Sequence, residues 1–128
     1  MMNIQKLRAV IAKYVSLDAN DDFATEECWK EMAEMLSEDV SDTIRFFESE
    51  CTVEELYWLS SIFEDIIAKT KSTDLISIWR FKLSNITPEK FNQEKFRSEF
   101  MQTAVTYADY VKSIEQEIDF AEGRIEQD

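Results

Sequence analysis

The sequence has very little glycine, proline or histidine. Its 128 residues include one glycine, one proline and no histidine. Hairpin turns draw heavily on glycine and proline, so their scarcity argues against an all-β fold. Phosphate-binding loops need several glycines close together, which excludes a P-loop and a dinucleotide fingerprint. The lack of histidine excludes Ser–His and Cys–His nucleophile pairs, histidine-ligated zinc and the histidines of di-iron bundles.

The two cysteines, Cys28 and Cys51, lie 23 residues apart and form no Cys-x-x-Cys unit. We therefore expect small buried hydrophobic residues in place of a redox or zinc site. Three basic residues interrupt the first 15 positions, so the N-terminus does not resemble a signal peptide. No apolar run approaches the roughly 18 residues of a membrane span, and the sequence predicts a cytoplasmic protein that binds no membrane.

Acidic residues dominate one part of the chain. The sequence has 14 basic and 27 acidic residues, a formal net charge of −13. Between residues 18 and 65, sixteen acids stand against only Lys30 and Arg45. Such a surface repels nucleic acid and anionic lipid, and it steers a basic partner towards itself. Solubility alone is the alternative explanation of this charge.

Apolar residues recur at intervals of three and four almost throughout, a spacing typical of amphipathic helices. We predict an all-α single domain over residues 1–128, with about six to seven helices and helix in more than about 65% of residues. Its architecture is either a stack of αα-hairpins or an irregular bundle. The expected helices cover residues 4–15, 22–36 (capped by Asp22 or Thr25), 37–47 (beginning near Ser37 or Asp39), 52–67, 72–83 (capped by Ser72 or Thr73) and 88–123, the last as one helix or two with a kink between 92 and 98.

Two helix starts carry specific signals. Thr52-Val-Glu-Glu55 is a capping box, in which the Thr52 hydroxyl accepts from the Glu55 amide and the Glu55 carboxylate reaches back. Thr87 precedes Pro88, a residue suited to the first helical position. The two starts lie 35 residues apart, which hints at stacked αα-hairpins. The two units share little identity, so an irregular bundle stays the alternative.

Pairs of carboxylates raise the question of enzymatic chemistry, because paired acids can hold a divalent cation or cleave a glycosidic bond. Candidate pairs at helical spacing are Glu27/Glu31, Glu34/Glu38 and Glu115/Asp119. The acidic run at residues 18–22 lacks the central glycine of a calcium-binding loop. No acid occupies a core position of the expected helices, as acid catalysis through a raised pKa would require. We predict no enzyme activity, metal or cofactor.

Four glutamates of the second expected helix form the most distinctive pattern. Their i, i+4, i+7, i+11 spacing places them in one row beside the apolar stripe of Cys28, Met32 and Met35 or Leu36. We call this row the acidic ridge: Glu27, Glu31, Glu34 and Glu38. Its successive like-charge pairs cost on the order of 1 kcal/mol in low salt. A solvated helix face tolerates that cost, whereas a basic partner would turn the repulsion into attraction.

A second set of acids surrounds the start of the 52–67 helix. These residues are Glu50, Glu54 and Glu55. They belong to the same acid-rich segment as the acidic ridge. We predict both sets as the residues that bind a basic partner.

Three stretches resemble a known group of proteins. They are Phe46–Asp65 (FFESECTVEELYWLSSIFED), Thr87-Pro-Glu, and Tyr110–Gly123 (YVKSIEQEIDFAEG). Through residues 38–125 the chain is similar to small, acidic, all-helical immunity proteins of bacterial contact-dependent growth inhibition and related polymorphic toxin systems. The resemblance implies a cytoplasmic inhibitor that binds the C-terminal domain of a cognate toxin, commonly a nuclease with a basic groove, and blocks its active site.

We therefore predict an inhibitor that acts by stoichiometric binding. The resemblance supplies no binding motif, so the contact residues named above come from charge alone. Two alternatives belong to other classes: an enzyme with a carboxylate-held metal, and a helical protein-interaction adaptor whose partner is unrelated to toxins. An upstream reading frame that encodes the end of a large secreted toxin would distinguish the inhibitor from both.

Overall fold

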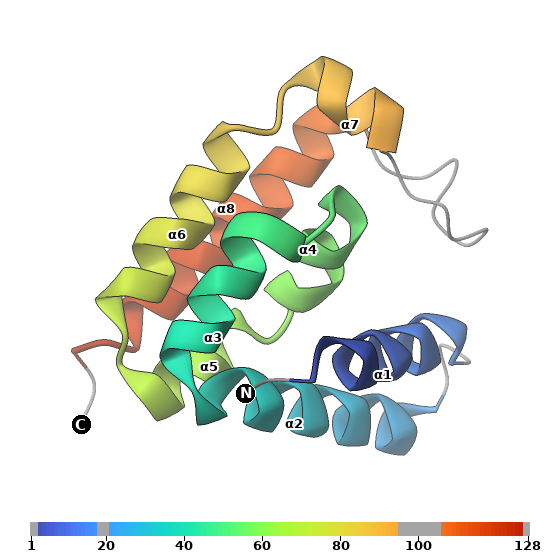
Figure 1. Cartoon of the computed structure of the whole chain (residues 1–128), viewed down its shortest axis with the longest axis vertical. Coiled ribbons are helices and arrows are strands. Elements are labelled where there is room, and N and C mark those ends of the chain that lie inside the picture. The colour runs from blue at the N-terminus through green and yellow to red at the C-terminus, as the bar shows by residue number, and fades with distance from the viewer. Residues whose placement is uncertain (1–2, 18–20, 95–105, 127–128) are drawn as a thin grey trace.

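The computed structural model describes residues 3–17, 21–94 and 106–126, and these residues form an irregular bundle of helices (Figure 1). In this part of the chain 84% of residues are helical and no strand occurs, which confirms the predicted all-α class. The elements in chain order are α1 (Ile4–Ser16), α2 (Asp22–Glu38), α3 (Val40–Arg45), the π-helical turn η1 (Phe46–Glu50), α4 (Val53–Ser60), α5 (Phe63–Thr70), α6 (Thr73–Ser84), α7 (Pro88–Glu94) and α8 (Tyr107–Gly123).

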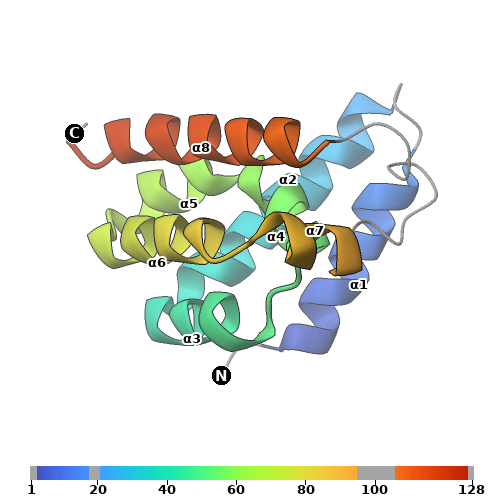
Figure 2. The ribbon, with the colours of Figure 1, turned by 90° about the horizontal axis from the view of Figure 1, so that it is seen from above.

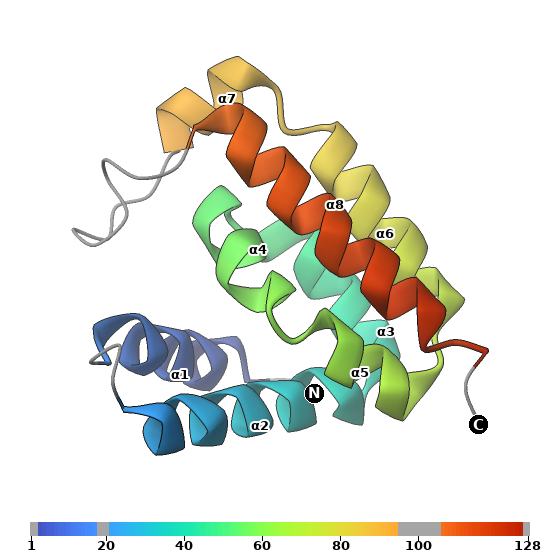
Figure 3. The same ribbon diagram turned by 180° about the vertical axis from the view of Figure 1, so that it is seen from behind.

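Two groups of helices meet in this bundle. Helices α5, α6 and α8 pack together, with α8 in contact with both of the others. Helix α1 packs on α2, and α2 joins the two groups through its contact with α5. Seen from above, α1 and α2 run across the direction of α6 and α8 (Figure 2), and the reverse view shows α8 lying along the outside of α5 and α6 (Figure 3). The crossed arrangement fits an irregular bundle better than a regular stack of hairpins.

Aromatic side chains fill the centre of the core. Trp79 of α6 stacks on Phe63 of α5, with ring centroids 3.8 Å apart and planes 7° from parallel. Phe47 of η1 meets both rings edge-on, at 5.7 Å from Trp79 and 6.1 Å from Phe63. Each buried ring removes about 150–250 Å² from water. This cluster therefore ties η1, α5 and α6 together.

Local capping signals place most of the helix starts. The capping box is present: the Glu55 amide donates to the Thr52 hydroxyl at 3.1 Å and the Thr52 amide to the Glu55 carboxylate at 3.0 Å. Ser72 caps α6 and Thr87 caps α7, as expected. Helix α2 begins at Asp22, but the predicted caps Asp22 and Thr25 were wrong, because the Asp21 carboxylate accepts from the Ala24 amide and caps the helix.

The expected helix over residues 52–67 is two helices, and the single-helix prediction was wrong. Helix α4 ends at Ser60, and Ile62 adopts φ −113° and ψ 8° before α5 begins. The Ser60 hydroxyl donates to the Tyr57 carbonyl at 2.6 Å, so the side chain occupies a backbone acceptor of the last turn of α4. The break lets α4 pack on α1 and α8 while α5 packs on α2 and α8.

In the described residues between 88 and 123 the chain forms two helices, α7 and α8, in agreement with one of the two alternatives. Thr106 has a non-helical backbone and its hydroxyl accepts from the Asp109 amide, so α8 starts there as a new helix. The apolar positions expected at Phe96, Phe100 and Ala104 lie outside the described residues, as does part of the proposed kink between 92 and 98.

Between residues 39 and 50 the chain departs from a simple helix. Asp39 caps α3, one of the two expected starts. The helix ends in a π turn in which the Cys51 amide donates to the Phe46 carbonyl at 2.9 Å. The wider turn brings two successive phenylalanines, Phe46 and Phe47, into the core. Periodicity in the sequence predicted only the second of them.

The prediction that no acid occupies a core position was wrong for Asp42. This residue of α3 is only 8% exposed, and its carboxylate forms an ion pair with Arg45. Helix α3 is short and touches α2, α6 and η1, so these neighbours cover even a polar position. Both cysteines are free thiols in the core, as predicted. Among the described helices, none has the length and apolar character required to cross a bilayer.

Candidate acidic interface

The acidic ridge lies on the solvent side of α2. All four of its glutamates are exposed, and the predicted inward stripe is confirmed, with Cys28, Met32 and Leu36 buried and Met35 half-buried. At about 3.6 residues per turn the ridge points roughly opposite this buried stripe. The stripe packs against α1, α3 and α5. The structure therefore brings the four ridge carboxylates together in one row that faces away from the rest of the bundle.

Basic side chains leave the acidic ridge uncompensated. Each of the four arginines in the described residues pairs with acids elsewhere: Arg8 with Glu55, Arg45 with Asp42, Arg80 with Asp119 and Glu122, and Arg124 with Glu64. Within the described part of the chain, no ridge glutamate lies within 4.0 Å of a basic nitrogen. No ridge glutamate therefore takes part in an ion pair within the described residues.

The ridge also opposes the dipole of its own helix. The C-terminal end of a helix carries partial negative charge and favours basic residues in its last turn. Helix α2 has none there, and it ends instead with Glu34 and Glu38 in its last two turns. These acids add an unfavourable interaction to their mutual repulsion. Helix stability alone therefore gives no reason for this placement.

The field of the ridge reaches the neighbouring thiol. The pKa of Cys28 is raised, mainly by burial, and the carboxylates of Glu31 and Glu27 raise it further. Lys13 of α1 opposes them. Raising the pKa keeps Cys28 protonated and unreactive. Cys28 is accordingly a structural residue beneath the ridge.

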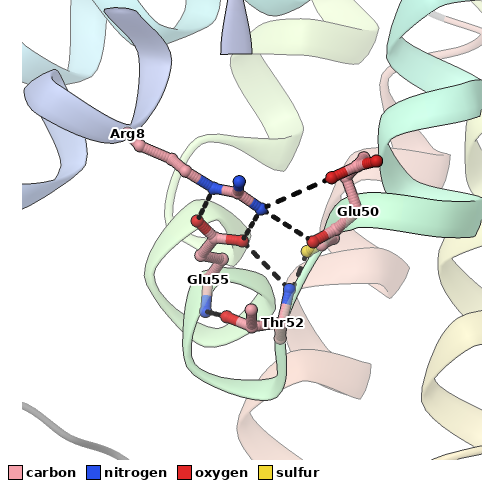
Figure 4. A network of polar contacts seen from close by, with 5 residues as sticks. Arg8, Glu50, Thr52 and Glu55 are labelled. Carbon is pink, nitrogen blue, oxygen red and sulfur yellow. Dashed lines mark hydrogen bonds and ion pairs between the residues drawn. The ribbon is translucent and has the colours of Figure 1, made fainter. Parts of the chain in front are cut away.

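Glu55, predicted as a partner-binding residue, is occupied within the fold (Figure 4). Arg8 of α1 donates through Nε to its carboxylate at 2.8 Å, while the other carboxylate oxygen accepts from the Thr52 amide at 3.0 Å. The Glu55 side chain is 12% exposed. The pKa of Arg8 is raised, chiefly by this hydrogen bond. Glu55 therefore fastens α1 to the start of α4.

Glu50 lies at the same junction. The Glu50 carbonyl accepts from Arg8 at 2.9 Å, and its carboxylate lies 4.0 Å from the same guanidinium and is 51% exposed. Glu54 is half-buried. Arg8 is the residue that sequence reasoning missed, because its partners lie 42 and 47 residues away and no local pattern connects them. Glu50 and Glu55 belong to the Arg8 junction, apart from the ridge.

The carboxylate pairs considered for metal binding gain no support. Asp119 of the Glu115/Asp119 pair accepts from Arg80 at 2.9 Å. Nowhere in residues 3–17, 21–94 and 106–126 do three or more potential ligands from His, Cys, Asp and Glu gather in a group that would hold a metal ion. The Glu27/Glu31 and Glu34/Glu38 pairs point to solvent.

Comparison with known proteins returned no match to a family model, to a curated protein or to a solved structure. Function must therefore be argued from the charge and geometry of the chain itself.

Proposed function

We propose that the protein is a cytoplasmic immunity protein that binds the basic C-terminal domain of a cognate toxin and blocks its active site. The observation that carries this proposal is the acidic ridge, whose carboxylates face solvent without a basic partner in the described structure. The resemblance of residues 38–125 to immunity proteins supplies the class of partner. In this proposal the protein acts by binding the toxin and catalyses no reaction itself.

The geometry of the ridge suits a nucleic-acid-binding groove. From Glu27 to Glu38 the row is about 16 Å long at 1.5 Å per residue. A nucleic-acid strand is a row of negative charges, and a nuclease groove binds it with basic groups. A straight ridge of carboxylates on a rigid helix offers that groove a substitute for its substrate. Its charge also speeds encounter, most strongly at low salt.

The proposal predicts stoichiometric protection. We expect the wild-type chain to form a one-to-one complex with the toxin domain encoded directly upstream, and to abolish its activity when the two are mixed in equal amounts. Co-expression should restore growth of cells that produce the toxin domain. Calorimetric titration measures the stoichiometry, and a toxin assay on the same samples measures inhibition.

Two double variants connect this activity to the ridge. Glu31→Lys with Glu34→Lys reverses two of the four ridge charges, while Glu115→Lys with Glu126→Lys changes net charge equally at exposed acids near α8. We expect the ridge variant to lose at least about tenfold in affinity, and the control to stay close to wild type, since desolvated charge contacts commonly contribute more than 1.4 kcal/mol. A wild type that does not bind would remove the immunity proposal. Equal losses in both variants would remove the ridge from the interface.

A further inference from the structure

A groove of different character is lined by residues of η1, of the C-terminal part of α6 and of the start of α7. Its volume is about 390 Å³. Its apolar lining comes from Phe47, Ile78 and Phe81. This size falls in the range of pockets that bind small ligands or a few side chains of a partner. The groove is separate from the acidic ridge, which lies on the solvent side of α2.

Phe81 gives the groove a rigid, exposed aromatic group. The residue is 65% exposed. Its carbonyl accepts from the Asn85 side chain at 2.7 Å, the Ser84 hydroxyl at 2.8 Å and the Asn85 amide at 3.2 Å. These bonds fix the backbone that carries the ring. A large aromatic side chain on a fixed backbone loses little entropy on binding, which is the property of an interface anchor.

The charge at the groove is opposite to that of the protein as a whole. Lys82 and Lys90 line it, against one acid, Glu48. Lys82 is half-buried, and no carboxylate described in the structure forms an ion pair with it. Burial raises the pKa of the Cys51 thiol and both lysines lower it, so both charges lie near this thiol. On a chain of net charge −13 this is a local basic, apolar site.

We propose that this groove docks a segment of a partner protein in which a large apolar side chain stands next to a carboxylate. The apolar group packs against Phe81 and Ile78, and the carboxylate meets Lys82. Charge complementarity selects this occupant, because Lys82 has no ion pair among the described residues and would repel a basic segment. A second copy is disfavoured, since two chains of this net charge repel each other. The proposal does not depend on the immunity function.

Selection from a phage library of random short peptides on the full-length chain tests the proposal. We expect the selected peptides to combine an acid with a neighbouring aromatic or leucine residue, and to compete with one another. Their affinity should fall at least tenfold for Phe81→Ala and for Lys82→Glu, and amide NMR shifts should concentrate at η1 and the ends of α6 and α7 that line the groove.

Matched control variants distinguish binding at the groove from non-specific hydrophobic or electrostatic binding. Phe120→Ala and Phe23→Ala remove the other large exposed phenylalanines of the described surface, and Lys112→Glu reverses an exposed lysine of α8. These variants, and the ridge variant Glu31→Lys with Glu34→Lys, should bind the peptides like wild type. Circular dichroism and thermal unfolding verify that each variant is folded.

Several outcomes would overturn the proposal. These are a selection that yields no binder or only basic sequences, and binders that tolerate both Phe81→Ala and Lys82→Glu. A wild type that sediments as a dimer, with Phe81→Ala monomeric, would assign the groove to a second copy. Toxin binding plays no part in this experiment, so the proposed immunity function can fail while the groove proposal holds.

Discussion

Helices α2 and α8 have the same length and nearly the same charge composition, yet their acidic side chains differ in whether they form ion pairs within the fold. Each has 17 residues and one lysine, with six acids in α2 and five in α8. In α8, Asp119 and Glu122 accept from Arg80 at 2.9 and 3.3 Å. Lys71 then donates to the Arg124 carbonyl just beyond its end. The ridge of α2 has no such partner among the described residues.

The difference shows that composition does not determine what an acidic helix does. Helix α8 lies beside α6, which presents Arg80 to it, so part of its charge is used within the fold. In the described part of the chain, no arginine forms an ion pair with the outer face of α2. The same residue types are structural in one helix and available to a partner in the other. This contrast is the physical basis of the proposed interface.

The largest effects should come from the buried faces, where the two helices are alike. Met32 of α2 and Ile118 of α8 are both 0% exposed. We expect Met32→Ala and Ile118→Ala each to lower the free energy of unfolding by about 2–5 kcal/mol, because each leaves a cavity in the core. Denaturant unfolding measures both. A cost under about 1 kcal/mol for Met32→Ala alone would mean that α2 is only loosely attached to the bundle.

Buried hydroxyl groups connect each helix to its neighbours and should give the next largest effects. The Tyr110 hydroxyl of α8 donates to the Val53 carbonyl at 2.7 Å, and the Thr43 hydroxyl donates to the Leu36 carbonyl of α2 at 2.7 Å. Tyr110→Phe and Thr43→Val should each cost about 1–3 kcal/mol, since each leaves a buried carbonyl without this donor. Chemical denaturation compares them with Tyr107→Phe, whose hydroxyl bond to Ile86 is only partly buried. If Tyr110→Phe and Thr43→Val lower the free energy of unfolding no more than Tyr107→Phe does, the buried hydroxyl groups do not have the stabilising role given to them here.

Charge reversal should have opposite signs in the two helices. Glu34→Lys with Glu38→Lys should stabilise the protein by about 1 kcal/mol in low salt, because it relieves repulsion and complements the helix dipole. Asp119→Lys with Glu122→Lys should destabilise it by up to about 1 kcal/mol, because Arg80 loses both partners. Thermal unfolding at low and high salt measures both, and salt should shrink both effects. Equal signs would contradict the contrast between the helices.

Most of the fold could be predicted from local sequence signals. The remaining features depend on contacts between residues far apart in the sequence, and the sequence does not show these contacts. The Thr52 capping box and the Cys28, Met32, Leu36 stripe depend on residues within one or two turns, so the sequence shows them directly. The break after Ser60 and the π turn at Phe46 allow packing against helices that are distant in the sequence, so no local pattern predicts them. The row of ridge glutamates was visible in the sequence. Its lack of counterions was not, because that depends on where Arg8 and the other arginines are placed by the fold.

The smallest predicted effect concerns Glu117 of α8. Its pKa is raised, first by burial and then by Glu64. The folded state therefore holds this proton more tightly than the unfolded state, so the group favours folding at low pH and that contribution is lost as pH rises through its folded pKa. Glu117→Gln should raise stability at neutral pH by about 0.5 kcal/mol or less, and the gain should vanish in acid. Unfolding of both proteins across pH measures this, and a gain that persists in acid would refute the cause.

The most direct test of the contrast between α2 and α8 is the association rate with the upstream-encoded toxin domain, measured by stopped flow at low and high salt. Wild type, the ridge variant Glu31→Lys with Glu34→Lys and the control Glu115→Lys with Glu126→Lys are compared. If the ridge steers the partner, the ridge variant associates more slowly and with a flatter salt dependence, while the control keeps a rate and slope close to those of wild type. Unchanged rate and slope in the ridge variant would contradict the claim that α2 keeps its charge for a partner.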